Sequence, residues 1–215
     1  MGRDNVTAIA SKARQRRRKL AHVHQFLIVL TGTDPLVWRR IQVPEQYSFW
    51  DLHVAIQDAM GWQDYHLHEF TVVHPGRQQV VRLGIPDEDF PEERPTLQGW
   101  KVGVTDYFTW GSPPGRYLYD FGDDWEHVLS YEGTWPAEDS ERYPRCMSGA
   151  AACPPEDCGG LGGYGEFLEA IRDPQHPEHR RMIEWAGGTF DPCAFDPGQV
   201  AFEDPWQRWK LAFDR

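Results

Sequence analysis

The chain has 215 residues, of which 40% are hydrophobic, and a formal net charge of −11 at pH 7, which allows one good-sized core. It has no apolar run near the roughly 20 residues that span a bilayer and no secretory signal in its first residues, so we expect a cytoplasmic protein outside the membrane. In that compartment its four cysteines are expected to be free thiols or metal ligands rather than disulfides.

The first predicted element is a basic tail, residues 1–20. It holds seven of the 22 Lys and Arg residues and one of the 33 acidic residues, so the tail carries +6 and the other 195 residues carry −17. An acidic body repels phosphate backbones, so a nucleic acid or another partner would be contacted through the tail. The alternative is a disordered tail that only aids solubility. The arm residues are Arg14, Arg16, Arg17, Arg18 and Lys19.

After the tail, residues 24–32 and 36–43 are predicted to form a β-hairpin. Gly, Asp and Pro fill the turn between them, as is typical of hairpins. Alternation along the first strand places Phe26, Ile28 and Leu30 on one face. We therefore expect that face to be buried.

A helix is predicted over residues 48–60. Ser48 is suited to the N-cap, apolar residues follow at helical spacing, and Gly61 is suited to end the helix. Residues 66–73 and 79–84 are then predicted to be antiparallel strands.

The remaining elements give the fold class. We predict loops at 85–100 and 134–162, a short helix at 104–110, strands at 116–121 and 125–133, and helices at 163–171, 177–186 and much of 197–213, where Pro205 should break or kink the last helix. Strands come first and helices later, which favours an α+β fold with an antiparallel or mixed sheet packed against helices. We expect a single domain, 21–215, with a cysteine loop (144–162) and a helical C-terminal part (163–213).

The cysteine loop contains Cys146, Cys153 and Cys158 in the spacing C-x6-C-x4-C. Three thiolates suit a structural Zn(II) site, which takes four ligands, and a metal would order this polar loop. We predict that His127, on the strand before the loop, is the fourth ligand, with Asp157, solvent or Cys193 as alternatives. The competing interpretation is a rigid Pro/Gly turn in which the cysteines pack as small apolar groups.

The sequence also contains a glycine-rich string, paired histidines and a cluster of carboxylates. GLGGYG (160–165) matches a dinucleotide-binding string but follows a loop instead of a strand, so we interpret it as a flexible helix entry. His66 and His68 share a strand face, as do Trp125 and His127. Four carboxylates are clustered in the predicted hairpin: Asp120, Asp123, Asp124 and Glu126. Such a cluster binds a cation, shares a proton or faces solvent at the hairpin tip.

Several blocks together resemble the plasmid pRiA4b ORF-3-like family, some members of which are labelled transposon passenger TnpR proteins. The blocks are LVWRRIQVP, AMGW, HLHEF, YDFGDDWEH, YPRC, CPPEDCGGLGGY and FDPCAFD, within residues 24–202. The resemblance implies an α+β fold and no established activity. The label suggests a resolvase, yet neither a serine nor a tyrosine recombinase residue set is found here. Cys193 and His68 depart from the family pattern, which lowers both as ligand candidates.

The arginine pair Arg39–Arg40 belongs to the first of these blocks. We expect both guanidinium groups to pair with the acidic hairpin, because neighbouring strands often match opposite charges. The pairing would make these charges structural.

The sequence favours a binding role over an enzyme, and it leaves the oligomeric state open. The first hypothesis is a plasmid- or mobile-element-type accessory module with a structural Zn(II) in the cysteine loop. The second is a metal-dependent hydrolase that uses His66, Asp123, Glu126 and His127. The third is a nucleic-acid-associated transposition accessory protein without recombinase chemistry.

Overall fold

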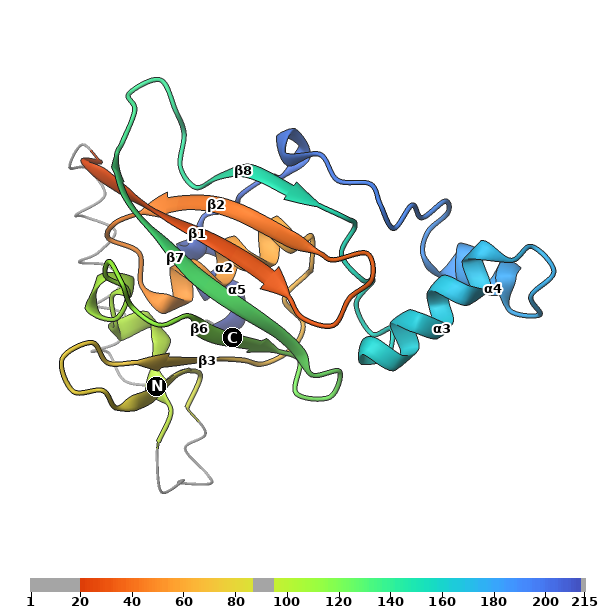
Figure 1. Cartoon of the computed structure of the whole chain (residues 1–215), viewed down its shortest axis with the longest axis horizontal. Helices are drawn as coiled ribbons and strands as arrows, with labels where there is room; N and C mark the ends of the chain where they lie inside the picture. Colours follow the sequence, from red (N-terminus) through yellow and green to blue (C-terminus); the bar gives the residue numbers. More distant parts are fainter. Residues whose placement is uncertain (1–19, 87–94, 214–215) are drawn as a thin grey trace.

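The computed structural model describes residues 20–86 and 95–213. In these residues one sheet of eight strands has the order β5-β4-β3-β6-β7-β1-β2-β8 (Figure 1). Its neighbouring strands are antiparallel apart from the parallel pair β4–β5. The strands are β1 His22–Leu30, β2 Trp38–Pro44, β3 His68–Val73, β4 Val80–Gly84, β5 Leu97–Gln98, β6 Gly115–Tyr119, β7 Trp125–Pro136 and β8 Arg145–Ala150. The predicted mixed sheet and α+β class are confirmed.

Helices α2 and α5 lie against the sheet, whereas α3 and α4 project beyond one end of it (Figure 1). The helices are α2 Phe49–Met60, α3 Gly160–Arg172, α4 His179–Trp185 and α5 Pro205–Phe213, with 3-10 turns at Gly99–Lys101, Val104–Asp106 and Pro197–Gln199. In the described part of the chain, no helix is both long enough and apolar enough to span a bilayer.

The α2 helix forms because its sequence supplies an N-terminal cap and a C-terminal glycine. The Ser48 side chain accepts a hydrogen bond from the backbone N–H of Asp51, and the Asp51 carboxylate accepts one from the backbone of Ser48, an arrangement that stabilises a helix by about 1 kcal/mol. Gly61 closes the helix in the left-handed conformation, at φ 86°. The helix predicted over 48–60 is confirmed.

The main core lies between α2 and the face of the sheet that carries Phe26, Ile28 and Leu30, all of them fully buried as predicted. A second cluster, Trp50, Val54, Trp100 and Trp209, joins α5 to α2. The indole N–H of Trp50 also donates to the carbonyl of Pro205 at 3.1 Å. The C-terminal helix α5 is therefore packed against α2.

The prediction of a loop over 134–162 is wrong in three places, one of which is its end, where α3 already begins at Gly160. Strand β7 continues to Pro136, and residues 145–150 form the edge strand β8, in which Cys146 lies opposite Ile41 of β2. The segment RCMSGA lacks β-branched and aromatic residues, so its strand state depends on long-range pairing. Pro205 also begins α5 instead of breaking it, since the first turn needs no proline N–H.

Candidate functional site

The segment 153–160, CPPEDCGG, runs from β8 past the end of the sheet to α3 (Figure 1). Backbone groups of this segment form hydrogen bonds with the neighbouring segments. The Pro154 carbonyl accepts from the indole N–H of Trp62 at 2.9 Å, and the N–H of Gly159 donates to Asp123 at 3.1 Å. Hydrogen bonds therefore hold this segment against the sheet.

Glu156 attaches the segment at two further points. Its carboxylate accepts from the backbone N–H of Gln63 at 2.7 Å and from the hydroxyl of Tyr119. Burial and then the hydrogen bond to Glu156 raise the pKa of Tyr119, so this hydroxyl stays protonated and remains a donor at neutral pH.

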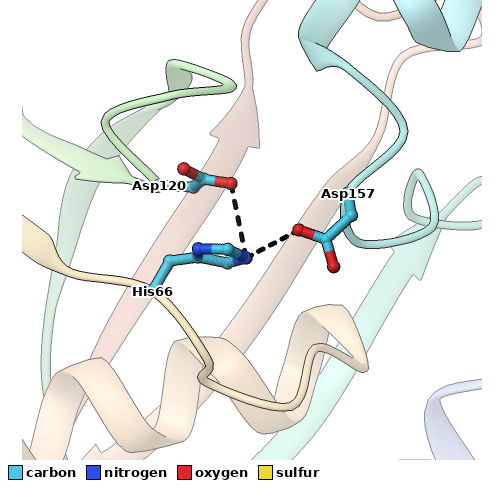
Figure 2. Close-up of side chains that lie close together, drawn as sticks. All are labelled: His66, Asp120 and Asp157. Carbon is cyan, nitrogen blue, oxygen red and sulfur yellow. Dashed lines mark hydrogen bonds and ion pairs between the residues drawn. The ribbon is translucent and has the colours of Figure 1, made fainter.

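Beside this attachment, His66 meets two carboxylates that come from separate segments (Figure 2). The Nε2 atom of His66 lies 2.9 Å from Oδ1 of Asp157 and 3.5 Å from Oδ2 of Asp120. The three ligand atoms all lie within 4.8 Å of one another. His66 precedes β3, Asp120 follows β6, and Asp157 belongs to the cysteine loop. The prediction that His66 and His68 share a strand face is therefore wrong, because β3 begins only at His68.

Both aspartates of this group have an unusual backbone conformation. Asp120 and Asp157 adopt left-handed conformations, at φ 57° and 59°, which aspartate tolerates better than most residues. Oδ1 of Asp120 accepts from the N–H groups of Gly122 at 2.9 Å and Asp123 at 3.3 Å, so Oδ2 remains for His66. Asp120 is only 8% exposed, whereas Asp157 is open to solvent.

The chemistry of these three donors is that of a cation site. An imidazole nitrogen and carboxylate oxygens bind Zn(II) at about 2.0–2.2 Å, so tetrahedral donors stand roughly 3.3–3.5 Å apart. The separation of 3.5 Å between His66 and Asp120 matches that spacing. Without a cation, Nε2 of His66 and Oδ1 of Asp157 lie within hydrogen-bonding distance of each other.

The structure does not gather the predicted zinc ligands Cys146, Cys153, Cys158 and His127. Among residues 20–86 and 95–213, His66, Asp120 and Asp157 form the one group of three or more potential ligands that lies this close together. The three cysteines pack, half-buried, against the core, as in the competing interpretation. Burial raises the pKa of Cys153, and it raises that of Cys158 to about 12. Zinc binding by these thiols stays a prediction.

His127 lies in the core instead of facing the cysteine loop. Its Nδ1 atom is 3.1 Å from the carbonyl of Trp125 and 3.3 Å from that of Tyr117. Burial lowers the pKa of His127 to about 4, so the ring is neutral. The predicted shared face of Trp125 and His127 is confirmed, since both are buried while Glu126 pairs with Arg116 on the half-exposed side.

The arginine pair does not bind the acidic hairpin, contrary to our expectation. The buried guanidinium of Arg39 donates at 2.8–3.0 Å to four backbone carbonyls, and the ring of Phe195 lies 3.6 Å from it. Arg40 forms a two-point ion pair with Glu132 at 2.8 and 2.9 Å. Strand register brings Arg40 and Glu132 together across β1.

The remaining candidate residues do not belong to the group formed by His66, Asp120 and Asp157. Asp124 is exposed at the hairpin tip, as the solvent-facing alternative predicted, and His68 is buried with its ring stacked 3.5 Å from that of His53. The arm residues Arg14, Arg16, Arg17, Arg18 and Lys19 lie outside the described residues, so their role stays a prediction.

Sequence reasoning missed a buried hydrogen-bonded chain. His53 bonds through Nδ1 to the Tyr117 hydroxyl at 2.8 Å and through Nε2 to Asp64 at 2.8 Å, and Gln57 donates to the same hydroxyl at 2.9 Å. A signal was present: His53 and Gln57 are polar, yet they stand four and eight residues after Phe49 on the apolar stripe of the helix.

Two glycines of GLGGYG, Gly160 and Gly163, lie in close backbone contacts. A Cβ atom at Gly160 would lie 2.5 Å from the carbonyl oxygen of Asp123, and one at Gly163 would overlap the carbonyl oxygen of Cys158. Gly160 also has a positive φ of 64°, which glycine adopts without strain. These contacts let the entry of α3 approach the hairpin closely.

Comparisons with known proteins place the chain. Residues 22–199 match the family described as "Plasmid pRiA4b ORF-3-like protein". The "Uncharacterized protein y4hQ" of Sinorhizobium fredii (strain NBRC 101917 / NGR234) is 36% identical over 194 residues, which cover 88% of this chain and 95% of that protein. The crystal structure of a protein of unknown function, MM3350 from Methanosarcina mazei Go1, aligns with a TM-score of 0.79 at 41% identity, over 86% of this chain and 100% of that one. This chain belongs to the plasmid pRiA4b ORF-3-like family.

Proposed function

We propose that the protein is a metal-binding accessory module of the plasmid and mobile-element type. A divalent cation binds between His66, Asp120 and Asp157 and fastens the 153–160 segment to the end of the sheet. The observation that carries this proposal is the approach of three potential ligand atoms, from three separate segments, to within 4.8 Å of one another.

Zn(II) is the cation that suits these donors best. One imidazole and two carboxylates form a borderline-hard ligand set. Three protein ligands leave a fourth position for water or for a group from a partner. Because Asp157 is solvent-exposed, that position would face outward.

The same geometry favours a binding module over the predicted hydrolase. Of the residues assigned to that hydrolase, Asp123 accepts from the backbone of Gly159, Glu126 pairs with Arg116, and His127 is enclosed in the core. Each of these groups already has a structural role, so they do not surround a common reacting atom.

The test is a titration of metal-free protein with zinc chloride by isothermal calorimetry. We expect one zinc ion per chain for the parent protein, and a loss of binding in His66→Gln and in Asp157→Asn. The matched control is His74→Gln, in the turn between β3 and β4, which should bind as the parent does. Zinc at 100 times its Kd should stabilise the parent by about 2.7 kcal/mol.

Three results would overturn the proposal. The first is a parent protein that binds no zinc. The second is zinc binding that His66→Gln and Asp157→Asn leave unchanged. The third is zinc-dependent hydrolysis of p-nitrophenyl phosphate or p-nitrophenyl acetate that disappears in His66→Gln, because that would identify an enzyme instead of an accessory module.

A further inference from the structure

We propose that the groove between α3 and α4 binds an arginine- or lysine-rich peptide segment of a partner protein, and that it shares Asp157 with the cation site. Apart from Asp157, the residues that line the groove lie outside that site. Only its coupling to a cation, through Asp157, rests on the proposed function.

The groove has an apolar floor with an incomplete cover. Its volume is about 460 Å³, and its apolar lining comes from Phe167, Ala170, Met182 and Trp185. No residue of α4 is fully buried. Trp185 remains 47% exposed although it packs edge-on against Phe167, at 5.8 Å between ring centroids. Exposed aromatic surface of this kind is typical of protein interfaces.

The rim of the groove is acidic. Four carboxylates line it against one arginine, so with His176 neutral the lining carries a formal charge of −3. The single arginine, Arg181, is bound to Glu178 at 2.9 Å. Glu166 and Glu169 stand three residues apart on α3, both exposed, so the negative charge follows one side of the helix. The four acidic residues are Asp157, Glu166, Glu169 and Glu178.

This combination selects organic cations with an apolar stem. A guanidinium or ammonium group is attracted to the face of an indole such as Trp185 and to the carboxylates, whereas phosphates are repelled. The carboxylates come from the loop before α3, from α3 itself and from the residue before α4, so a peptide with several basic side chains fits them better than a single small amine does. We therefore assign a basic peptide to the groove.

Asp157 couples the groove to the cation site, because it lines the groove and also lies beside His66. A divalent cation on Asp157 neutralises one of the groove's carboxylates. The cation should therefore weaken binding of the basic peptide, and by linkage the peptide should weaken binding of the cation by the same factor.

The experiment measures fluorescence polarisation of a fluorescein-labelled hexa-arginine peptide with the full chain. We expect saturable binding that weakens roughly fivefold to tenfold in Trp185→Ala and at least as much in Glu166→Lys. The matched controls are Trp110→Ala, at an 85% exposed tryptophan, and Glu138→Lys, which makes the same change in net charge. Thermal unfolding checks that all four variants are folded.

Equal losses in Glu166→Lys and Glu138→Lys would overturn the proposal, because the peptide would then respond only to net charge. Displacement of the labelled peptide by spermine that is as effective, per charge, as displacement by unlabelled peptide would also overturn the proposal. In that case the occupant would be a small amine.

The same peptide-binding measurement, repeated with zinc, distinguishes the cation proposal from the groove proposal. Zinc should weaken peptide binding to the parent and have no effect on Asp157→Asn. If zinc binds nowhere while the losses in Trp185→Ala and Glu166→Lys persist, the cation proposal fails and the groove stands. If zinc binds as proposed and those losses are absent, the groove proposal fails alone.

Discussion

Replacing Arg39 with methionine removes a buried charge that joins α2 to the end of β8 and to Ala151, the residue after it. Arg39 is 1% exposed, and its guanidinium donates to the carbonyls of Trp38, Ala59, Ala150 and Ala151. A buried carbonyl that loses its donor costs about 1–3 kcal/mol. The variant partly offsets this by avoiding the desolvation of a guanidinium, so we expect a net loss of about 3–5 kcal/mol.

Equilibrium unfolding in urea measures this loss. With a slope of about 2–3 kcal/mol/M, the midpoint of Arg39→Met should fall by roughly 1–2.5 M. Arg39→Lys should also be destabilised, because an ammonium group cannot reach four carbonyls with the geometry of a guanidinium. The control Arg180→Met, at a side chain that is 91% exposed, should leave the midpoint unchanged. A loss below about 1 kcal/mol in Arg39→Met would refute the role given to these hydrogen bonds.

Three further predictions concern the thiols, a buried histidine and the glycines. At pH 8, dithionitrobenzoate should react rapidly with the exposed Cys193 and slowly with Cys158, whose pKa is raised to about 12; a fast phase that survives in Cys193→Ser would contradict this. The pKa of His127 falls from 6.5 to about 4 on folding, so between these values the unfolded state binds more protons and stability falls as the pH falls. Urea unfolding at pH 7 and pH 5 should therefore show a loss about 2 kcal/mol smaller in His127→Gln than in the parent, and equal losses would exclude that shift. Gly163→Ala should cost more than about 2 kcal/mol through overlap with a carbonyl, whereas Gly162→Ala, in open space within the same helix, should stabilise by up to about 1 kcal/mol; similar melting temperatures for the two variants would argue against the close approach.

The elements that the sequence predicts well are those fixed by nearby residues. The α2 helix carries its own cap at Ser48 and its own stop at Gly61, so periodicity and local hydrogen bonds suffice. Strand β8 was missed because it exists through pairing with β2, more than a hundred residues earlier. No pattern within the segment RCMSGA indicates that partner.

The candidate site shows the same limit. The local pattern indicates His66 and Asp120 as candidates within their own segments, but it indicates Asp157 only as an alternative fourth ligand for the cysteines. Their approach depends on contacts such as that from Glu156 to Gln63, 93 residues apart in the chain. Spacing among cysteines directed attention to sulfur, whereas the loop presents its carboxylates to the sheet.

The most direct test of the central claim is an anomalous difference map, measured at the zinc absorption edge, from crystals grown with zinc. The account predicts a peak about 2.0–2.2 Å from Nε2 of His66 and from carboxylate oxygens of Asp120 and Asp157. A peak among the sulfur atoms of Cys146, Cys153 and Cys158, with none beside His66, would contradict it.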